Sequence, residues 1–291
     1  MSRVAGPPPT PPPHDGAGGT GSPWPAGRRG WLGPAAAGRP TRCGGTGAQR
    51  RGTLLVPARV QRPEIIDRPD NFAHDLRHAL GDIRAVNRWL GGSRALRLAL
   101  RPLLLGADAD RPLAVLDVGT GCGDLPLALV RLARRLGRRV RITAIDRDPA
   151  TAAFARRRTA AVDEIRVVRA DAFAPPFRPG SFDVVTASLF LHHFHEPEVV
   201  ALLATFRRLA RRAVVINDLR RHVLPWCAIH LLARITVRHT IFVHDAPLSV
   251  LRGFTDGELL QAAAACGAPD AELRRRWPFR LVLTLPGGVG A

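Results

Sequence analysis

The segment from Leu113 to Leu125, LAVLDVGTGCGDL, carries the clearest chemical signal in the chain. An apolar strand leads to Asp117, then to Gly119, Gly121 and Gly123, and then to an expected helix. Dinucleotide-binding turns space their glycines as Gly-x-Gly-x-x-Gly, so that a helix N-terminus meets a pyrophosphate. Here the third glycine comes one residue early, and the carboxylate of Asp117 would repel a phosphate. The turn therefore favours a cationic ligand, which the glycines allow to approach the backbone closely.

Three further strand ends carry polar residues that could line the same crevice. The expected strand Val140–Ile145 ends at Asp146, whose carboxylate could accept hydrogen bonds from two ribose hydroxyls. The strand Ile165–Arg169 leads to Asp171, placed to hold the exocyclic amine of an adenine, and the strand Ser181–Ser188 ends at the same edge. Each aspartate alone is equally well explained as a strand-end or helix-capping residue. Three in register with the glycines fit S-adenosylmethionine, which has an ammonium group and no phosphate.

The motifs LDVGTGCGD, AIDRD, RADAF and FDVVTASLFLHHF resemble the class I S-adenosylmethionine-dependent methyltransferases, in particular the ubiquinone and menaquinone biosynthesis group. The resemblance covers about residues 64–286 and is more specific for the cofactor than for the substrate. It implies an α/β, Rossmann-like fold with a seven-stranded, mostly parallel sheet, an antiparallel edge pair and a helical substrate cap. It also implies S-adenosyl-L-methionine as cofactor. The predicted cofactor-binding residues are Asp117, Gly119, Thr120, Gly121, Gly123, Asp146, Arg147, Asp171, Ala172 and Ser188.

The rest of the pattern alternates strands and helices, as expected for a parallel sheet. The final two strands are joined through Trp277 and Pro278 with no room for a helix, which predicts an antiparallel pair at one edge. Helix starts are indicated by Asp148 followed by a proline, and by a capping box from Thr255 to Glu258. The other expected elements are a helix over 197–210 and strands over 213–216, 270–276 and 279–285.

Two segments have no place in the expected sheet: Asp75–Leu104 and Leu219–Gly253, both with apolar residues at helical spacing. Core packing explains such stripes more often than a ligand cavity does. Helices over the carboxyl ends of parallel strands nevertheless form acceptor pockets, so we expect these segments to build an apolar substrate cap. Their stretches DLRHALGDIRAVNRWLGG, NDLRRHVLP and HDAPLSVLRGFT are similar to a bacterial methyltransferase subgroup associated with polyketide and alkylpyrone-type products. That similarity implies a small apolar acceptor with an acidic hydroxyl.

Methyl transfer is an in-line displacement, so a base is needed only if the acceptor arrives protonated. Histidine is the natural base near neutral pH, although a loop histidine is more often structural. His193, after the fourth strand, and His222, after the fifth, are the predicted catalytic bases. His192 and Trp226 are the predicted acceptor contacts. Because Trp226 follows His222 by four residues, the two would share one face of a helix.

Composition sets the first 60 residues apart. They contain 11 prolines, 13 glycines and eight arginines against one acidic residue, without apolar periodicity. Such a segment buries too little apolar surface to offset its conformational entropy. We therefore expect a disordered tail over residues 1–60 and a methyltransferase domain over 61–291.

The formal net charge of +19 raises the possibility of nucleic-acid binding. However, all 43 basic residues are arginines and aromatics make up only 5% of the chain, so high-GC codon usage explains much of the charge and few rings could stack on bases.

The four cysteines lack metal-ligand spacing, and no constellation elsewhere predicts a metal site. Together with the lack of a long apolar segment, they favour a cytoplasmic protein without a transmembrane span. The function that the sequence favours is O-methylation of a small molecule. The alternatives are quinone-ring C-methylation and RNA binding or modification by a protein with the methyltransferase fold. The sequence does not indicate an oligomeric state.

Overall fold

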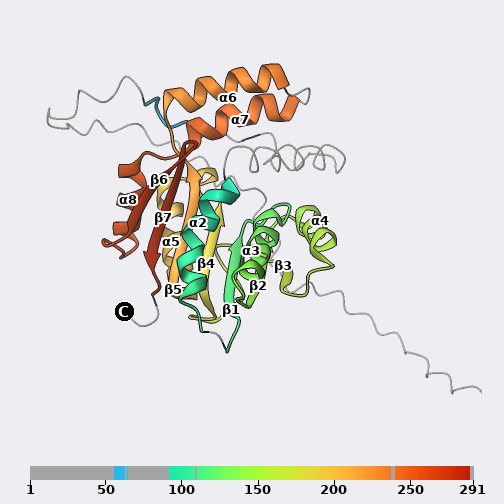
Figure 1. Cartoon of the computed structure of the whole chain (residues 1–291). Coiled ribbons are helices and arrows are strands. Elements are labelled where there is room, and N and C mark those ends of the chain that lie inside the picture. Colours follow the sequence, from blue (N-terminus) through green and yellow to red (C-terminus); the bar gives the residue numbers. More distant parts are fainter. Residues whose placement is uncertain (1–55, 63, 65–91, 109, 237–239, 289–291) are drawn as a thin grey trace, which may run out of the picture. The chain divides into compact units, whose positions relative to one another are not determined.

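A seven-stranded sheet forms the centre of the described part of the chain, which comprises residues 56–62, 64, 92–108, 110–236 and 240–288 of the computed structural model (Figure 1). Its strands are β1 (Leu113–Val118), β2 (Val140–Asp146), β3 (Ile165–Arg169), β4 (Phe182–Ser188), β5 (Ala210–Leu219), β6 (Glu272–Arg276) and β7 (Arg280–Pro286). They lie in the order β3-β2-β1-β4-β5-β7-β6. The first five are parallel, whereas β7 runs antiparallel to β5 and β6. The predicted mostly parallel sheet with an antiparallel edge pair is confirmed.

Helices cover both faces of the sheet because side chains of its central strands alternate between two apolar clusters. In β5, Val214 and Ile216 belong to the cluster that α5 (Glu196–Leu209) and α8 (Asp256–Ala265) complete. Val215 belongs to the opposite cluster, which α2 (Gly92–Leu105) and α3 (Asp124–Arg135) complete. The remaining helices are α4 (Pro149–Thr159), the 3-10 turn η3 (Leu191–His193), α6 (Val223–Thr236) and α7 (Thr240–Arg252).

Capping residues start two helices where the sequence predicted. The Asp148 carboxylate accepts a hydrogen bond from the Thr151 N–H at 2.7 Å before α4. Thr255 and Glu258 form the expected capping box of α8. Strand β5 is longer than expected: it spans Ala210–Leu219 rather than 213–216, because its first residue pairs with β4 and its last three residues pair with β7.

The predicted substrate cap is only partly present in the described residues. The part of Asp75–Leu104 that is described, from Gly92 onward, packs on a face of the sheet as α2, so its assignment to the cap was wrong. Its apolar stripe packs against α3, β5 and β7, as the core interpretation of such a stripe expects. Residues 75–91 lie outside the described residues. The second segment forms α6 and α7, which lie side by side beyond the carboxyl end of β5, and α7 contacts η3 (Figure 1).

A short N-terminal stretch, residues 56–62 and 64, packs against α7 and is called the strap below. The Val60 N–H donates to the Leu251 carbonyl oxygen at 3.2 Å. Arg59 donates to the carbonyl oxygen of Arg252 at 2.9 Å and places its guanidinium 4.4 Å from the centre of the Phe254 ring. Residues 56–60 were expected to belong to the disordered tail, but they pack against α7. Residues 1–55 lie outside the described residues. All described residues belong to one unit, Thr41–Ala291.

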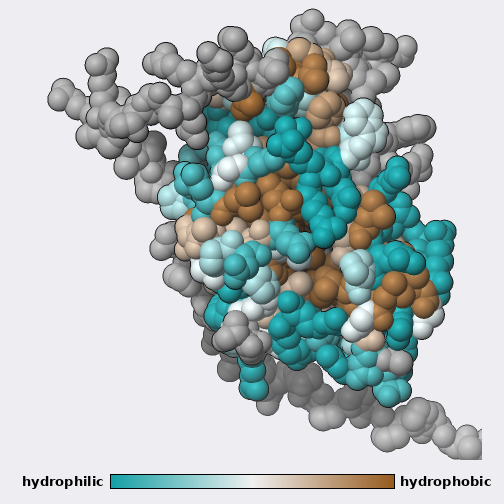
Figure 2. All heavy atoms as spheres, turned by 60° about the vertical axis from the view of Figure 1, so that its left-hand side comes forward, coloured by the Kyte–Doolittle hydropathy of each residue, from teal (hydrophilic) through white to brown (hydrophobic). Residues whose placement is uncertain are grey.

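Charged and apolar groups are interspersed on the face seen in Figure 2, where hydrophobic patches are separated by hydrophilic ones. Trp277, in the β6–β7 turn, is the most exposed large apolar residue of the described chain, with 78% of its surface accessible. No helix among the described residues has the length and apolar content needed to cross a membrane.

Candidate active site

The glycine-rich turn between β1 and α3 has the backbone shape that its composition predicts. Gly119, Gly121 and Gly123 have φ angles of +65°, +55° and +73°, which side chains of L-residues rarely adopt. A Cβ at Gly119 would lie 2.3 Å from the ring of Phe190, so this turn contacts the residue that precedes η3. A Cβ at Gly121 would meet nothing within 4 Å. The turn is also tied to β2, because the Thr120 N–H donates to the Ile145 carbonyl oxygen at 3.0 Å.

Asp117, near the end of β1, is a buried carboxylate with unused hydrogen-bonding capacity. The hydroxyl of Thr186 in β4 donates to its Oδ1 at 3.0 Å. Its Oδ2 accepts no hydrogen bond from the described residues, although it is buried. Burial raises the pKa of Asp117 to about 6, even though the neighbouring hydroxyls of Thr120 and Thr186 lower it. A cationic or hydrogen-bond-donating group beside Oδ2 would satisfy this oxygen and favour the charged form.

Asp146, at the end of β2, holds the glycine turn in place. Its Oδ2 accepts from the Gly121 N–H at 3.0 Å, and its Oδ1 accepts from the Asp148 N–H at 3.1 Å. Burial nevertheless raises the pKa of Asp146 to about 6. Each carboxylate oxygen has a second lone pair, so the predicted binding of ribose hydroxyls remains chemically available. The sequence did not predict the additional role in shaping the turn.

The other predicted cofactor residues follow the ends of neighbouring strands and differ in how exposed they are. The Ala170 N–H donates to the Asp146 carbonyl oxygen at 3.1 Å, which brings the segment after β3 next to β2. Asp171 is exposed and accepts from the Phe173 N–H at 3.0 Å. Arg147 is half-buried, whereas Ala172 packs in the core. The Ser188 hydroxyl accepts from the Asn217 side-chain amide at 2.7 Å, and the buried Oδ1 of Asn217 accepts nothing from the described residues.

His192 is buried and paired with Asp218, a residue that sequence reasoning did not select. The distance from His192 Nδ1 to Asp218 Oδ1 is 2.7 Å. Asp218 Oδ2 also accepts from the N–H of Leu191 at 2.9 Å, which fixes the η3 turn relative to β5. Burial would raise the pKa of Asp218, but the interaction with His192 holds it below its ordinary value. Because Nδ1 donates to this carboxylate, the neutral imidazole presents the lone pair of Nε2 on its other side.

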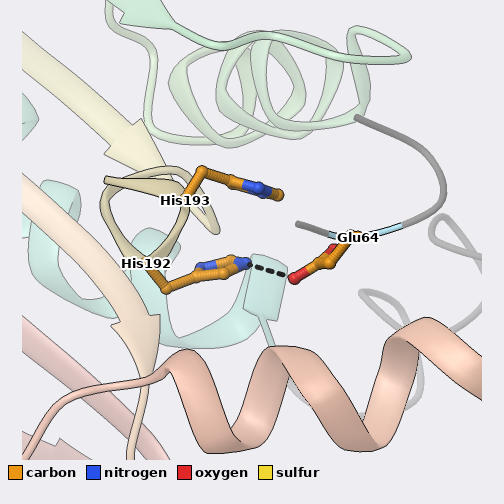
Figure 3. Close-up of side chains that lie close together, drawn as sticks. All are labelled: Glu64, His192 and His193. Carbon is orange, nitrogen blue, oxygen red and sulfur yellow. Dashed lines mark ion pairs between the residues drawn. The ribbon is translucent and has the colours of Figure 1, made fainter. Parts of the chain in front are cut away.

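That other side faces Glu64 of the strap, as Figure 3 shows. His192 Nε2 lies 3.7 Å from Glu64 Oε1, and the rings of His192 and His193 have their centres 4.2 Å apart. One nitrogen of each histidine and one oxygen of Glu64 all lie within 4.8 Å of one another. We call Glu64, His192 and His193 the histidine cluster. It brings the predicted base His193 and the predicted acceptor contact His192 together.

Ser249 and Arg252 of α7 hold the histidine cluster from a second side. The Ser249 hydroxyl donates to Glu64 Oε1 at 2.8 Å. Arg252 donates to the carbonyl oxygens of His192 and His193 at 3.1 and 2.7 Å, and its Nε lies 4.0 Å from Glu64 Oε1. Sequence reasoning missed Glu64, Asp218 and Arg252. Of these, only Asp218 carried a signal, because it ends a strand next to a polar residue, as Asp146 does.

His222 and Trp226 differ from their predicted arrangement. His222 comes one residue before α6, so the two residues do not share a helical face as expected. Its Nδ1 accepts from the Leu224 N–H at 3.2 Å, which places the proton of the neutral ring on Nε2. His222 is thus used as a helix-start acceptor, outside the histidine cluster. Trp226 is half-buried in the first turn of α6.

Comparison with known proteins agrees with this geometry. Residues 115–213 match a family model described as a methyltransferase domain. The demethylmenaquinone methyltransferase of Thermus thermophilus is 36% identical over 126 residues, which are 43% of this chain and 54% of the relative. The chain thus spans about half the length of the curated relative that it matches.

Two solved structures share the fold. The citrinin polyketide synthase CMeT domain superposes with a TM-score of 0.53 at 14% identity, over 67% of this chain and 52% of that one. The CurJ carbon methyltransferase superposes with a TM-score of 0.54 at 13% identity, over 76% and 62%. The described chain therefore shares its fold with these two methyltransferase structures, and residues 115–213 match the methyltransferase-domain family.

Proposed function

We propose that the protein transfers the methyl group of S-adenosyl-L-methionine to the hydroxyl of a small apolar acceptor. The observation that carries the proposal is the buried Oδ2 of Asp117, which accepts no hydrogen bond from the described residues and lies in the strand that leads to the open side of Gly121. An ammonium group of a bound ligand would pair with this oxygen. S-adenosyl-L-methionine has such a group and supplies a methyl carbon activated by a sulfonium.

The chain's own residues divide the work between two sides. On the cofactor side, Asp146 shapes the glycine turn and retains lone pairs for ribose hydroxyls. On the acceptor side, the histidine cluster follows β4, and Phe190 contacts the glycine turn directly. This contact supports the view that an acceptor near η3 would meet a cofactor held by the turn. The proton of the acceptor hydroxyl is then removed at the histidine cluster.

Quinone-ring C-methylation is the second candidate. It is favoured by the similarity to a demethylmenaquinone methyltransferase, whose name indicates a quinone substrate. A reduced quinone and a phenol both carry an acidic hydroxyl, so the same histidine cluster would serve either reaction. The two differ in the atom that receives the methyl group, which a product analysis distinguishes.

The test combines cofactor binding with product analysis. Calorimetry measures the affinity of S-adenosylhomocysteine for the wild type, for Asp117→Asn and for the exposed control Asp163→Asn. Loss of a charge-assisted contact should weaken binding by about 10- to 100-fold in Asp117→Asn only. Equal affinities of all three folded proteins would reject the proposed cofactor site. Mass spectrometry of phenols, a naphthoquinol and RNA incubated with labelled cofactor then identifies the acceptor, and methylation of RNA alone would overturn the acceptor class.

A further inference from the structure

We propose that Glu64, His192 and His193 bind a divalent first-row transition-metal ion, with Zn²⁺ as the best-matched ion. The three candidate ligand atoms lie within 4.8 Å of one another (Figure 3). Three ligands on one face of a four- to six-coordinate ion, with bonds of about 2.0–2.2 Å, are separated by roughly 3–3.5 Å. Small side-chain rotations therefore suffice to close the site. Two histidines and a glutamate are also a ligand set of catalytic zinc sites, which keep a position open for an oxygen ligand.

The hydrogen-bond geometry of His192 supports this assignment. Its Nδ1 donates to Asp218, so the Nε2 lone pair of the neutral ring points toward the carboxylate of Glu64 at 3.7 Å. A lone pair and a carboxylate oxygen repel each other unless a proton or a cation lies between them. A proton on Nε2 would satisfy this pair of atoms, whereas a metal ion could in addition bind the nearby nitrogen of His193. A metal ion uses all three atoms.

The surrounding residues provide the support that metal ligands require. A carboxylate that accepts the second ring N–H of a histidine ligand fixes its orientation and raises its basicity, which is the relation of Asp218 to His192. Asp218 is itself held by the N–H groups of Leu191 and Leu219, at 2.9 and 2.8 Å. The hydroxyl of Ser249 donates to Glu64 Oε1 and so orients that carboxylate. These partners are in place before any ligand binds.

Nearby arginines set the charge of the site. Arg252 lies 4.0 Å from Glu64 Oε1, and the buried Arg280, whose pKa burial lowers to about 10, interacts with Asp218. Arg59 also interacts with Asp218, so the guanidinium groups near the site outnumber the carboxylates of Glu64 and Asp218. A divalent ion would add positive charge in excess, which lowers metal affinity. The same excess would lower the pKa of a coordinated hydroxyl more strongly than a balanced site does.

This inference rests on the proposed function for its chemical role. The acceptor oxygen would coordinate the ion and release its proton to solvent. The oxygen–methyl bond then forms while the methyl–sulfur bond breaks, and the electron pair of that bond remains on the sulfur of S-adenosylhomocysteine. The ion would thus replace a free base as the group that makes the acceptor nucleophilic.

Metal binding can be measured without cofactor or acceptor. The untagged full-length protein is treated with a chelator, dialysed and titrated with Zn²⁺ by calorimetry, and Co²⁺ absorption reports the coordination geometry. The variants are His193→Ala, Glu64→Gln and the control His195→Ala, which changes an exposed histidine outside the cluster. We expect one Zn²⁺ per wild-type chain, retained in the control, and affinity at least tenfold weaker in His193→Ala and Glu64→Gln.

Two outcomes would overturn the inference: failure of the wild type to bind one Zn²⁺, or the same Zn²⁺ affinity in His193→Ala as in the wild type. If Glu64→Gln fails to fold, the half-buried position of His193 still gives a decisive variant. Full methylation by the metal-free protein would reject the catalytic role assigned to the ion and leave the proposed function intact. If the wild type fails to bind S-adenosylhomocysteine but binds Zn²⁺, the proposed function is rejected and the metal site stands.

Discussion

Replacement of Gly121 by alanine separates the role of the glycine turn in binding from its role in folding. Gly121 has a φ angle of +55°, and an added Cβ would meet no atom of the protein within 4 Å. The folded state therefore suffers only the backbone strain of a left-handed alanine, about 1–2 kcal/mol. In a domain of this size the strain corresponds to a fall of about 2–8 °C in melting temperature.

Gly137 offers a matched control. Its φ angle is +63°, and an added Cβ there would also meet nothing within 4 Å, but it follows α3, away from the carboxyl edge of the sheet. Gly137→Ala should therefore lose a similar amount of stability. Only at Gly121 would the methyl group enter the space assigned to the ligand, where overpacking of about 1–3 kcal/mol weakens binding roughly 5- to 150-fold.

The assay is thermal melting of both variants, followed by calorimetric titration with S-adenosylhomocysteine at a temperature where both are folded. We expect similar melting temperatures and a loss of affinity in Gly121→Ala alone. If both variants bind with the affinity of the wild type, the open side of Gly121 is not the binding surface. If both lose affinity equally, general destabilisation explains the effect.

Further predictions follow from other contacts. Because burial raises the pKa values of Asp117 and Asp146 to about 6, affinity for S-adenosylhomocysteine should fall about fivefold per carboxylate between pH 6 and pH 5 as they become protonated; an unchanged calorimetric affinity would contradict this. The same raised values mean that the unliganded fold loses stability as pH rises from about 4 to 6, which melting scans can follow. Removal of residues 1–55 should preserve melting temperature and affinity, whereas removal of residues 1–64 deletes the strap and should lower the melting temperature by about 5 °C or more; equal melting would show that the strap contributes nothing. Asp183→Asn breaks the 2.9 Å contacts of a buried carboxylate with Arg111, whose side chain is 52% exposed, and should cost about 1–3 kcal/mol in denaturant unfolding; cofactor affinity should be retained because Asp183 lies at the opposite end of β4.

The sheet and the glycine turn were predictable because their signals are local. Buried strands read as short apolar runs, and each ends at a polar residue or a turn within a few positions. The antiparallel edge pair followed from the lack of room for a helix around Trp277 and Pro278. In these regions the residue pattern that indicates each strand or turn lies in one short stretch of sequence, although the strands themselves pair over long separations, such as Val115 with Val184.

The acceptor side was less predictable because its contacts connect distant segments. Glu64 meets His192 only after the strap, η3 and α7 have come together, and no spacing rule relates them. Apolar periodicity likewise could not distinguish the core helix α2 from a cap, since both bury one face. His222 was assigned to a helix face, but the helix begins one residue later, and single-residue differences at helix starts change the direction of a side chain.

The strap also has a consequence for the order in which the molecule is built. Arg59 and Arg252, which are hydrogen-bonded to each other, lie 193 positions apart in the chain. During synthesis the strap leaves the ribosome first, whereas its binding surface on α7 is translated near the end. The glycine turn contacts β2, less than 30 residues away, and can form early. A nascent chain would thus form the glycine turn well before Glu64 reaches the histidines, so that the proposed activity is expected only after translation of the C-terminal helices.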